Sequence, residues 1–344
     1  MASESRGTVL LAFSANLAIA IAKTVAGVIS LSSAMLAEAA HSWADTLNEV
    51  FLLTSLKRAK RPADSQHPFG YGKERFFWTL LAAVGIFVTG AGFSVFQGVS
   101  SLLRHVEKPD AAEFTLTYVV LGVSLVLEGA SLMRAVKQVS AEAREHGRTF
   151  FTHLRRSHDP TVKTVASEDS AAVAGILLAA LGVGLHQATG SAAYDAAASI
   201  TIGVLLAWIA YALGRDTKDL LIGEAADPEL RLDIQHLVGG YPEVDAVLEL
   251  LTMQLSPDDV LVAMRVDFVN DVDGDRIEQV STEIEQALME QLPSVRHVFL
   301  DATASTEEQR ELADLTQQLA ADDAAGDPDA AGRLAALERQ RDRR

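Results

Sequence analysis

Six long apolar stretches within the first 215 residues constrain this chain more than any other feature. They cover Val9–Ile29, Ala34–Leu56, Phe76–Leu103, Phe114–Val136, Val162–His186 and Ala192–Leu213. A helix needs about 20 mostly apolar residues to cross a lipid bilayer, and each stretch meets that length. We therefore predict an all-α transmembrane domain of six helices over residues 1–215.

The basic residues between these stretches predict the orientation of the domain. Loops rich in lysine and arginine face the cytoplasm. Here they join the second stretch to the third and the fourth to the fifth, and a shorter basic segment follows the sixth. Both termini are therefore expected in the cytoplasm. The basic residues concerned are Lys57, Arg58, Lys60, Arg61, Lys73, Arg75, Lys137, Arg144, Arg148, Arg155, Arg156, Lys163, Arg215 and Lys218.

The composition of the chain changes near Arg215. The formal net charge is +2 up to this residue and −19 after it. Residues 216–303 have the pattern of a helix, two strands, a helix and a strand, separated by turns. This α-β-β-α-β order predicts a small, ferredoxin-like α+β domain in the cytoplasm. Residues 304–344 are acidic and charged and contain almost no aromatic residues, which indicates a frayed helix or a disordered tail.

Composition also excludes several classes of function. The sequence contains no cysteine, which excludes a disulfide scaffold, a zinc finger and a thiol nucleophile. The total net charge of −17 argues against nucleic acid as a partner, because neutralising phosphates requires a basic surface.

Ionisable residues within the apolar stretches are costly to bury and therefore indicate function. In the second stretch, His41 and Asp45 are four residues apart and share one helix face, and Glu49 continues that face toward the cytoplasm. An imidazole and a carboxylate at this spacing can bind a divalent cation, and this mixture of ligands suits zinc and its first-row neighbours. Alternatively, His41 and Asp45 only hydrogen-bond each other between helices.

The fifth stretch carries two adjacent carboxylates, Glu168 and Asp169, in its first third. Like charges so close together cannot both stay ionised without a counter-charge, and a bound divalent cation is the simplest one. Adjacent helical positions differ by about 100°, so one ion need not contact both residues. The alternative is that Glu168 faces cytoplasmic water and only Asp169 is buried.

Lys23, Glu128 and Asp195 also fall within the apolar stretches. Polar contacts between helices are a simpler interpretation of all three than metal binding. Lys23 can serve as a counter-ion in helix packing, Glu128 can carry protons, and Asp195 can cap the start of its own helix.

With these features the chain resembles the cation diffusion facilitator family over roughly residues 8 to 302. Within that family it is most similar to the branch of zinc transporter nine. The motifs that carry the resemblance are Ser33-Ala-Met-Leu-Ala-Glu-Ala-Ala followed by His41 and Asp45, His67-Pro-Phe-Gly-Tyr71-Gly-Lys, Gly85-Ile-Phe-Val-Thr-Gly-Ala-Gly-Phe-Ser, Ser124-Leu-Val-Leu-Glu128-Gly-Ala, Glu168-Asp169-Ser-Ala-Ala-Val-Ala-Gly175 and Tyr194-Asp195.

The resemblance implies a homodimeric antiporter that exports a divalent metal, commonly zinc, against inward proton flow. Iron, manganese and cobalt are the alternative cargoes, and no cofactor is expected. The implied metal ligands are His41, Asp45 and Asp169. The family's usual fifth-span pattern has a ligand four residues before the Asp, where this chain has Val165, and Glu168 is the candidate replacement.

Three rival functions are weighed against this one. An intramembrane metalloenzyme would need a pattern such as His-Glu-x-x-His, which the sequence lacks. A membrane-bound metal sensor or scaffold would bind the ion without moving it, and a passive channel would carry it regardless of the proton gradient. Because no presequence rich in arginine and serine is visible, we expect a bacterial cytoplasmic membrane.

Overall fold

The structure is a computed structural model and describes residues 6–103, 111–145, 149–150, 154, 160–324, 329–330, 332–333 and 336–337. The chain divides into two compact units, Met1–Leu221 and Ile222–Arg344. Of the predicted cytoplasmic basic residues, Arg148, Arg155 and Arg156 lie outside the described residues.

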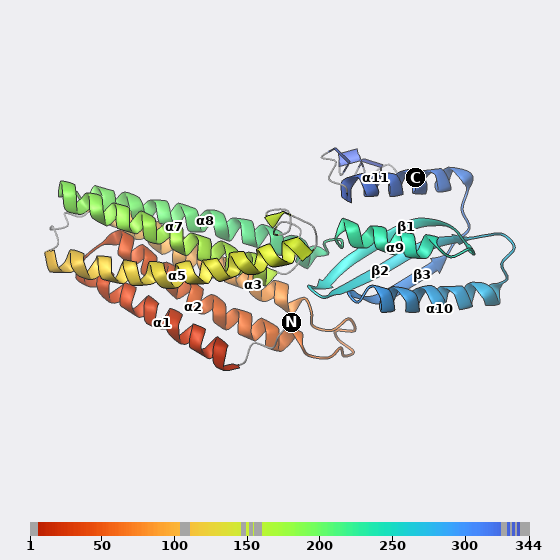
Figure 1. Ribbon diagram of the computed structural model, residues 1–344, viewed down its shortest axis with the longest axis horizontal. Coiled ribbons are helices and arrows are strands. Elements are labelled where there is room, and N and C mark those ends of the chain that lie inside the picture. The colour runs from red at the N-terminus through yellow and green to blue at the C-terminus, as the bar shows by residue number, and fades with distance from the viewer. Residues whose placement is uncertain are drawn as a thin grey trace. The chain divides into compact units, whose positions relative to one another are not determined.

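In the first unit the described residues form six helical rods (Figure 1). Four segments are long and apolar enough to cross a membrane, namely Glu74–Leu103, Glu113–Arg144, Lys163–Thr189 and Ala193–Ile222. The rods are α1 (Arg6–Ile29), α2 (Ser33–Ala59), α3 (Glu74–Gly85) continued through the π-helical η1 (Ile86–Gly92) into α4 (Phe93–Leu103), α5 (Ala111–Glu145), α7 (Pro160–Thr189) and α8 (Ala193–Ile222).

The other two rods are α1 and α2. Helix α1 has 24 residues, most of them apolar. Helix α2 has 27 residues, which is ample length, but Glu38, His41 and Asp45 lower its mean hydropathy. These side chains lie inside the bundle, and α2 presents apolar residues such as Leu47 and Val50 outward. The helix is thus polar on its inner face and apolar on its outer face, as a membrane requires.

Small residues let α4 and α8 approach closely. A Cβ atom at Gly98 would lie 2.7 Å from the carbonyl oxygen of Ala196, and one at Gly203 would lie 2.7 Å from a side chain on α4. In the same interface the Ser199 hydroxyl donates to the carbonyl oxygen of Ser94 at 2.8 Å. Close backbone approach and hydroxyl hydrogen bonds are the usual means of joining helices where lipid removes the hydrophobic driving force.

Asp195 of α8 caps the start of α2 rather than its own helix. Its carboxylate accepts hydrogen bonds from the Ser32 hydroxyl (2.7 Å), the Ser33 hydroxyl (2.8 Å) and the Ser33 amide (2.5 Å). The expectation that Asp195 caps its own helix is therefore corrected. Free amides at a helix N-terminus attract a negative charge, and here that charge comes from a helix distant in sequence.

We expect Asp195→Ala to lower the free energy of unfolding by about 2 kcal/mol, because it leaves buried donors at the start of α2 without an acceptor. Asp195→Asn keeps one acceptor oxygen and should lose less. Chemical denaturation of the full chain in detergent measures both, with Asp219→Ala as control, because Asp219 is half-exposed and pairs with its neighbour Lys218. Equal stability of Asp195→Ala and Asp219→Ala would contradict this account of the cap.

The second unit contains a three-stranded sheet covered by two helices (Figure 1). β1 and β2 are antiparallel, β2 and β3 are parallel, and β2 is the central strand. Buried residues of β2, including Val262 and Val266, pack with Ile234 of α9 and with Ile284 and Leu288 of α10. The elements are α9 (Pro228–Gly239), β1 (Val244–Ser256), β2 (Asp259–Phe268), α10 (Gly274–Gln291) and β3 (Val295–Ala302).

The predicted fold class is thereby confirmed: an all-α membrane domain followed by a small α+β domain in the order α-β-β-α-β. The sequence left the segment after residue 304 open between a frayed helix and disorder. In the structure Glu307–Ala324 form helix α11. Arg310 anchors its first turn through ion pairs with Asp245 (2.8 Å) and Asp267 (3.1 Å), so this part of the tail is a packed helix.

Arg276 of α10 binds the carboxylate of Glu243, which immediately precedes β1. Its Nε and Nη2 atoms donate to Glu243 Oε1 at 2.9 Å and 2.5 Å. These hydrogen bonds lower the pKa of Glu243 below its ordinary value of 4.5. Because the folded-state pKa is depressed, the ionised carboxylate stabilises the fold above the ordinary pKa, and this contribution is lost as pH falls through the folded-state pKa.

We therefore expect Glu243→Gln to raise hydrogen–deuterium exchange in β1 and α10 at pH 7, because it removes this charge-assisted contact. When exchange rates are corrected for their intrinsic pH dependence, the difference from the unsubstituted chain should shrink below about pH 4. A difference that stays constant from pH 7 to pH 3 would show that the carboxylate's charge is not responsible.

Candidate metal site

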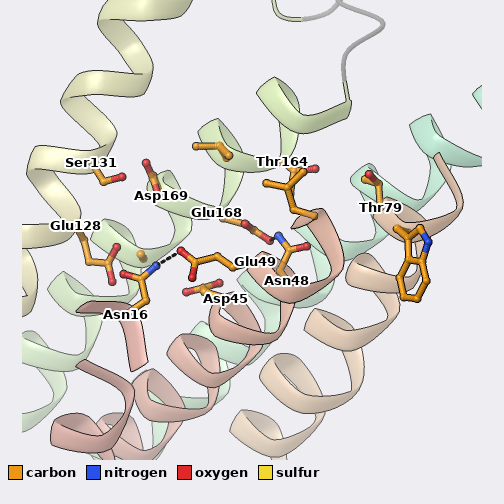
Figure 2. A pocket seen from close by; sticks show the side chains of 14 residues that line it. Asn16, Asp45, Asn48, Glu49, Thr79, Glu128, Ser131, Thr164, Glu168 and Asp169 are labelled. Atoms are coloured by element: carbon orange, nitrogen blue, oxygen red, sulfur yellow. Dashed lines mark hydrogen bonds between the residues drawn. The ribbon is translucent and has the colours of Figure 1, made fainter. Parts of the chain in front are cut away.

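A cavity of about 130 Å³ lies among the membrane helices (Figure 2). Five helices contribute to its lining, which includes five carboxylates, two amides and three hydroxyls. The volume is enough for a small ion with several water molecules. The lining residues are Asn16 of α1; Asp45, Asn48, Glu49 and Leu52 of α2; Trp78 and Thr79 of α3; Glu128 and Ser131 of α5; and Thr164, Val165, Glu168, Asp169 and Ala172 of α7.

Helices α2 and α7 face this cavity with the same sequence spacing. On α2 the lining residues begin at Asp45 and continue three, four and seven positions later. On α7 the same intervals recur from Val165, with Thr164 in addition, so that Glu168 and Asp169 both reach the cavity. These intervals mark one face of a helix. Both adjacent carboxylates of α7 therefore line one cavity, and whether a single ion contacts both stays a prediction.

The structure brings three of the four predicted ligands to the cavity: Asp45, Glu168 and Asp169. Glu168 accepts a hydrogen bond from the Asn48 amide at 2.5 Å. Within the part of the chain that is described, Asp45 Oδ1 and Asp169 Oδ2 are buried without a hydrogen-bond partner. Glu49 Oε2 and Thr164 Oγ1 are in the same state. Buried polar oxygens are normally satisfied, so these atoms of the cavity lining can take up a donor or a cation.

The fourth predicted ligand, His41, lies one turn deeper along α2. It is 1% exposed and is not part of the cavity lining. Its Nδ1 is 3.4 Å from Asp45 Oδ1, yet in the described residues neither ring nitrogen makes a hydrogen bond. The two side chains thus lie within ion-pair distance of each other, without a hydrogen bond between them.

The four predicted ligands do not form a ready-made coordination sphere. No group of three or more His, Asp or Glu side chains among the described residues is positioned to hold a metal ion. Two of the carboxylates already accept a hydrogen bond from an amide. Asn48 donates to Glu168, and Asn16 donates to Glu49 at 2.6 Å (dashed in Figure 2). Side-chain rotations would be needed before one ion could contact residues on both helices.

Sequence reasoning missed the amides and hydroxyls of the cavity. Asn48 lies three residues after Asp45, on the same helix face, and that spacing is a signal that could have identified it. Asn16 is a lone amide in an apolar stretch, which is a weaker signal. Ser131 and Thr164 show no sequence feature that separates them from other hydroxyl residues of the membrane helices.

The other intramembrane charges have distinct surroundings. Lys23 is fully buried and pairs with Glu38 at 3.0 Å, so it is a counter-ion between α1 and α2. Asp195 caps α2, as described above. Glu128 lines the cavity.

Two family models match the chain. A model described as the cation efflux transmembrane domain matches residues 9–222. A model described as the cation efflux protein, cytoplasmic domain, matches residues 226–302. Together they span both units and include every residue that lines the cavity.

A plant, a human and a bacterial protein are each similar to most of this chain. Metal tolerance protein C4 of Arabidopsis thaliana is 36% identical over 239 residues, which cover 70% of this chain and 52% of the relative. The mitochondrial proton-coupled zinc antiporter SLC30A9 of Homo sapiens is 34% identical over 247 residues, which cover 72% and 43%. The chain thus spans about half the length of these two relatives. The manganese efflux system protein MneP of Bacillus subtilis is 24% identical over 315 residues, which cover 90% and 100%.

We expect Asp45→Asn and Asp169→Asn to weaken Zn²⁺ binding by the full chain at least about tenfold, because each removes an ionised oxygen from the cavity. Isothermal titration calorimetry in detergent measures the change. Asp216→Asn is the matched control, because Asp216 is an exposed carboxylate of α8 that pairs with Lys163. Unchanged affinity in both cavity variants would contradict the assignment of the site.

Proposed function

The chain belongs to the cation efflux family, which is the cation diffusion facilitator family that its motifs resemble, and on this premise we propose that it is a proton-coupled antiporter exporting a divalent metal. The observation that carries the proposal is the convergence of Asp45, Glu168 and Asp169 on one cavity inside the membrane helices. Carboxylates at this depth are expensive unless they serve an ion pathway.

We propose that His41, Asp45, Glu168 and Asp169 bind the cargo. His41 and Asp45 supply a nitrogen and an oxygen from α2, and the two α7 carboxylates supply oxygens from the opposite wall. Glu168 compensates for Val165, which occupies the usual ligand position and cannot coordinate a metal. The unpartnered atoms of His41, Asp45 and Asp169 support this ligand set.

Zinc is the proposed cargo, with iron, manganese or cobalt as alternatives. One imidazole with several carboxylates suits any of these first-row ions. The human relative is named a zinc antiporter and the Bacillus relative a manganese efflux protein, so both cargoes occur among the relatives' names.

Proton coupling follows from the chemistry of the ligands. A carboxylate or imidazole must be deprotonated before it binds a metal, so metal binding releases protons and protonation releases metal. If the cavity opens alternately to the two sides, protons arriving from outside displace the metal there. Their departure to the cytoplasm restores the site, and the cycle exports metal as protons enter.

The remaining parts of the proposal concern assembly and location. We propose a homodimer with both termini in the cytoplasm, built from a transport domain (1–215), a cytoplasmic dimerisation domain (216–303) and a tail (304–344). The match of residues 226–302 to the cytoplasmic domain of cation efflux proteins supports the proposed cytoplasmic domain. A bacterial cytoplasmic membrane is the proposed location, and the match to the Bacillus protein over 90% of the chain supports it.

The test is Zn²⁺ flux in proteoliposomes with and without a pH gradient. We expect gradient-driven flux, and we expect Asp45→Ala and Asp169→Ala to reduce it at least about tenfold, because each loses a proposed ligand. Asp216→Ala is the control and should transport normally.

Two results would replace the proposal. Flux that ignores the pH gradient would indicate a passive channel. Zinc that binds in calorimetry but does not cross the membrane would indicate a membrane-bound metal sensor or scaffold.

A further inference from the structure

The Lys23–Glu38 pair lies in the membrane unit but outside the cavity, and the proposed transport chemistry does not use it. Both side chains are fully buried, with Lys23 Nζ 3.0 Å from Glu38 Oε2. Lys23 also donates to the Ser42 hydroxyl at 2.9 Å. The ammonium group thus fixes the Glu38 side chain from one side, and Ser42 holds the ammonium in place.

The carboxyl group of Glu38 also packs between α2 and α7. Gly175 of α7 is the recess that receives it: a Cβ atom there would lie 2.1 Å from Glu38 Oε1. Only a glycine leaves room for this carboxylate. The side chain therefore fills the space between the two helices that carry the proposed ligands.

The position of Glu38 along α2 relates it to the cavity. The cavity includes Asp45 but neither His41 nor Glu38. At 1.5 Å per residue, Glu38 lies about 10 Å beyond Asp45, toward the start of α2. On α7, Gly175 likewise lies beyond Asp169 and Ala172. Between α2 and α7 there is thus a cavity on the cytoplasmic side of His41, whereas Glu38 fills the space on the other side.

We propose that Glu38, held by Lys23 and seated against Gly175, is the plug that closes the metal site from the non-cytoplasmic side. Outward opening then requires α7 to move away from Glu38. This inference rests on the proposed function, because it takes the α2–α7 contact as the route of the ion.

The absence of cysteine from the chain permits a direct test. Ala172→Cys introduces a single thiol in the cavity lining, between Asp169 and Gly175 on α7. The full chain is reconstituted in sealed vesicles, and a membrane-impermeant, positively charged methanethiosulfonate is added to one side at a time. The rate of modification from each side reports which side the cavity opens to, and it does not require metal transport.

Two variants remove the plug by different means. Lys23→Met with Glu38→Ala deletes it without leaving a buried charge unpaired. Gly175→Ala keeps both charges but fills the recess, so that Glu38 must leave its seat. Two controls match these variants: Lys163→Met breaks the more exposed Lys163–Asp216 pair, and Gly129→Ala adds a methyl where nothing lies within 4 Å.

We expect both plug variants to raise the rate of thiol modification from the non-cytoplasmic side about tenfold, because they shift the population toward the outward-open state. The rate from the cytoplasmic side should stay the same or fall, and both controls should behave as the parent.

The proposal is overturned if, from the non-cytoplasmic side, the thiol introduced by Ala172→Cys is modified no faster with Gly175→Ala than with Gly129→Ala. It is also overturned if both sides accelerate equally, because a general loosening of the bundle and not a plug would explain that result. Failure of transport alone, with the expected change in accessibility, would instead count against the proposed function.

Discussion

Helix α2 places ionised and polar side chains in the middle of a membrane bundle, and lipid cannot solvate them. Glu38, His41 and Asp45 follow one another along its inner face, while Leu47 and Val50 face outward. The polar face of α2 must therefore be enclosed by protein. The arrangement of the surrounding helices can be understood as the solution to this requirement, since α1, α5, α7 and α8 each supply a partner or a wall to it.

Each part of the polar face is enclosed in a different way. Asp195 of α8 satisfies the free amides at the start of the helix. Lys23 of α1 neutralises Glu38 in a fully buried pair. Farther along, the face borders a cavity, and Asn48 binds the α7 carboxylate Glu168 across it. The polar face of α2 is thus closely packed at one end and borders a cavity at the other.

The second unit is stabilised by a different balance of forces. Water surrounds it, so apolar burial drives its folding. Residues such as Val262, Val266 and Leu288 form its core. Ion pairs of Arg276 and Arg310 then fix its edges, where α10 meets the start of β1 and where α11 joins the domain. Its family model is that of a cytoplasmic domain, and its composition is acidic.

The sequence predicted those features that depend on local pattern. Apolar length and loop charge predicted the helices and their orientation, and alternation of apolar residues predicted the strands. The spacing of His41, Asp45, Glu168 and Asp169 identified two helix faces that carry potential ligands. Val165 was recognisable as a departure from the family pattern because the position of Asp169 is fixed by the motif.

Contacts between distant segments could not be predicted in the same way. Nothing local says that Asp195 caps another helix, that Lys23 selects Glu38, or that Gly175 is a recess for that carboxylate. These pairings depend on which helix faces meet, and one helix face can pack against several others at similar cost. The sequence by itself determined the membrane helices, the domain order and the ionisable residues that α2 and α7 carry. Only the tertiary structure decided which of them share a cavity, because a shared cavity requires side chains from several helices to come together in space.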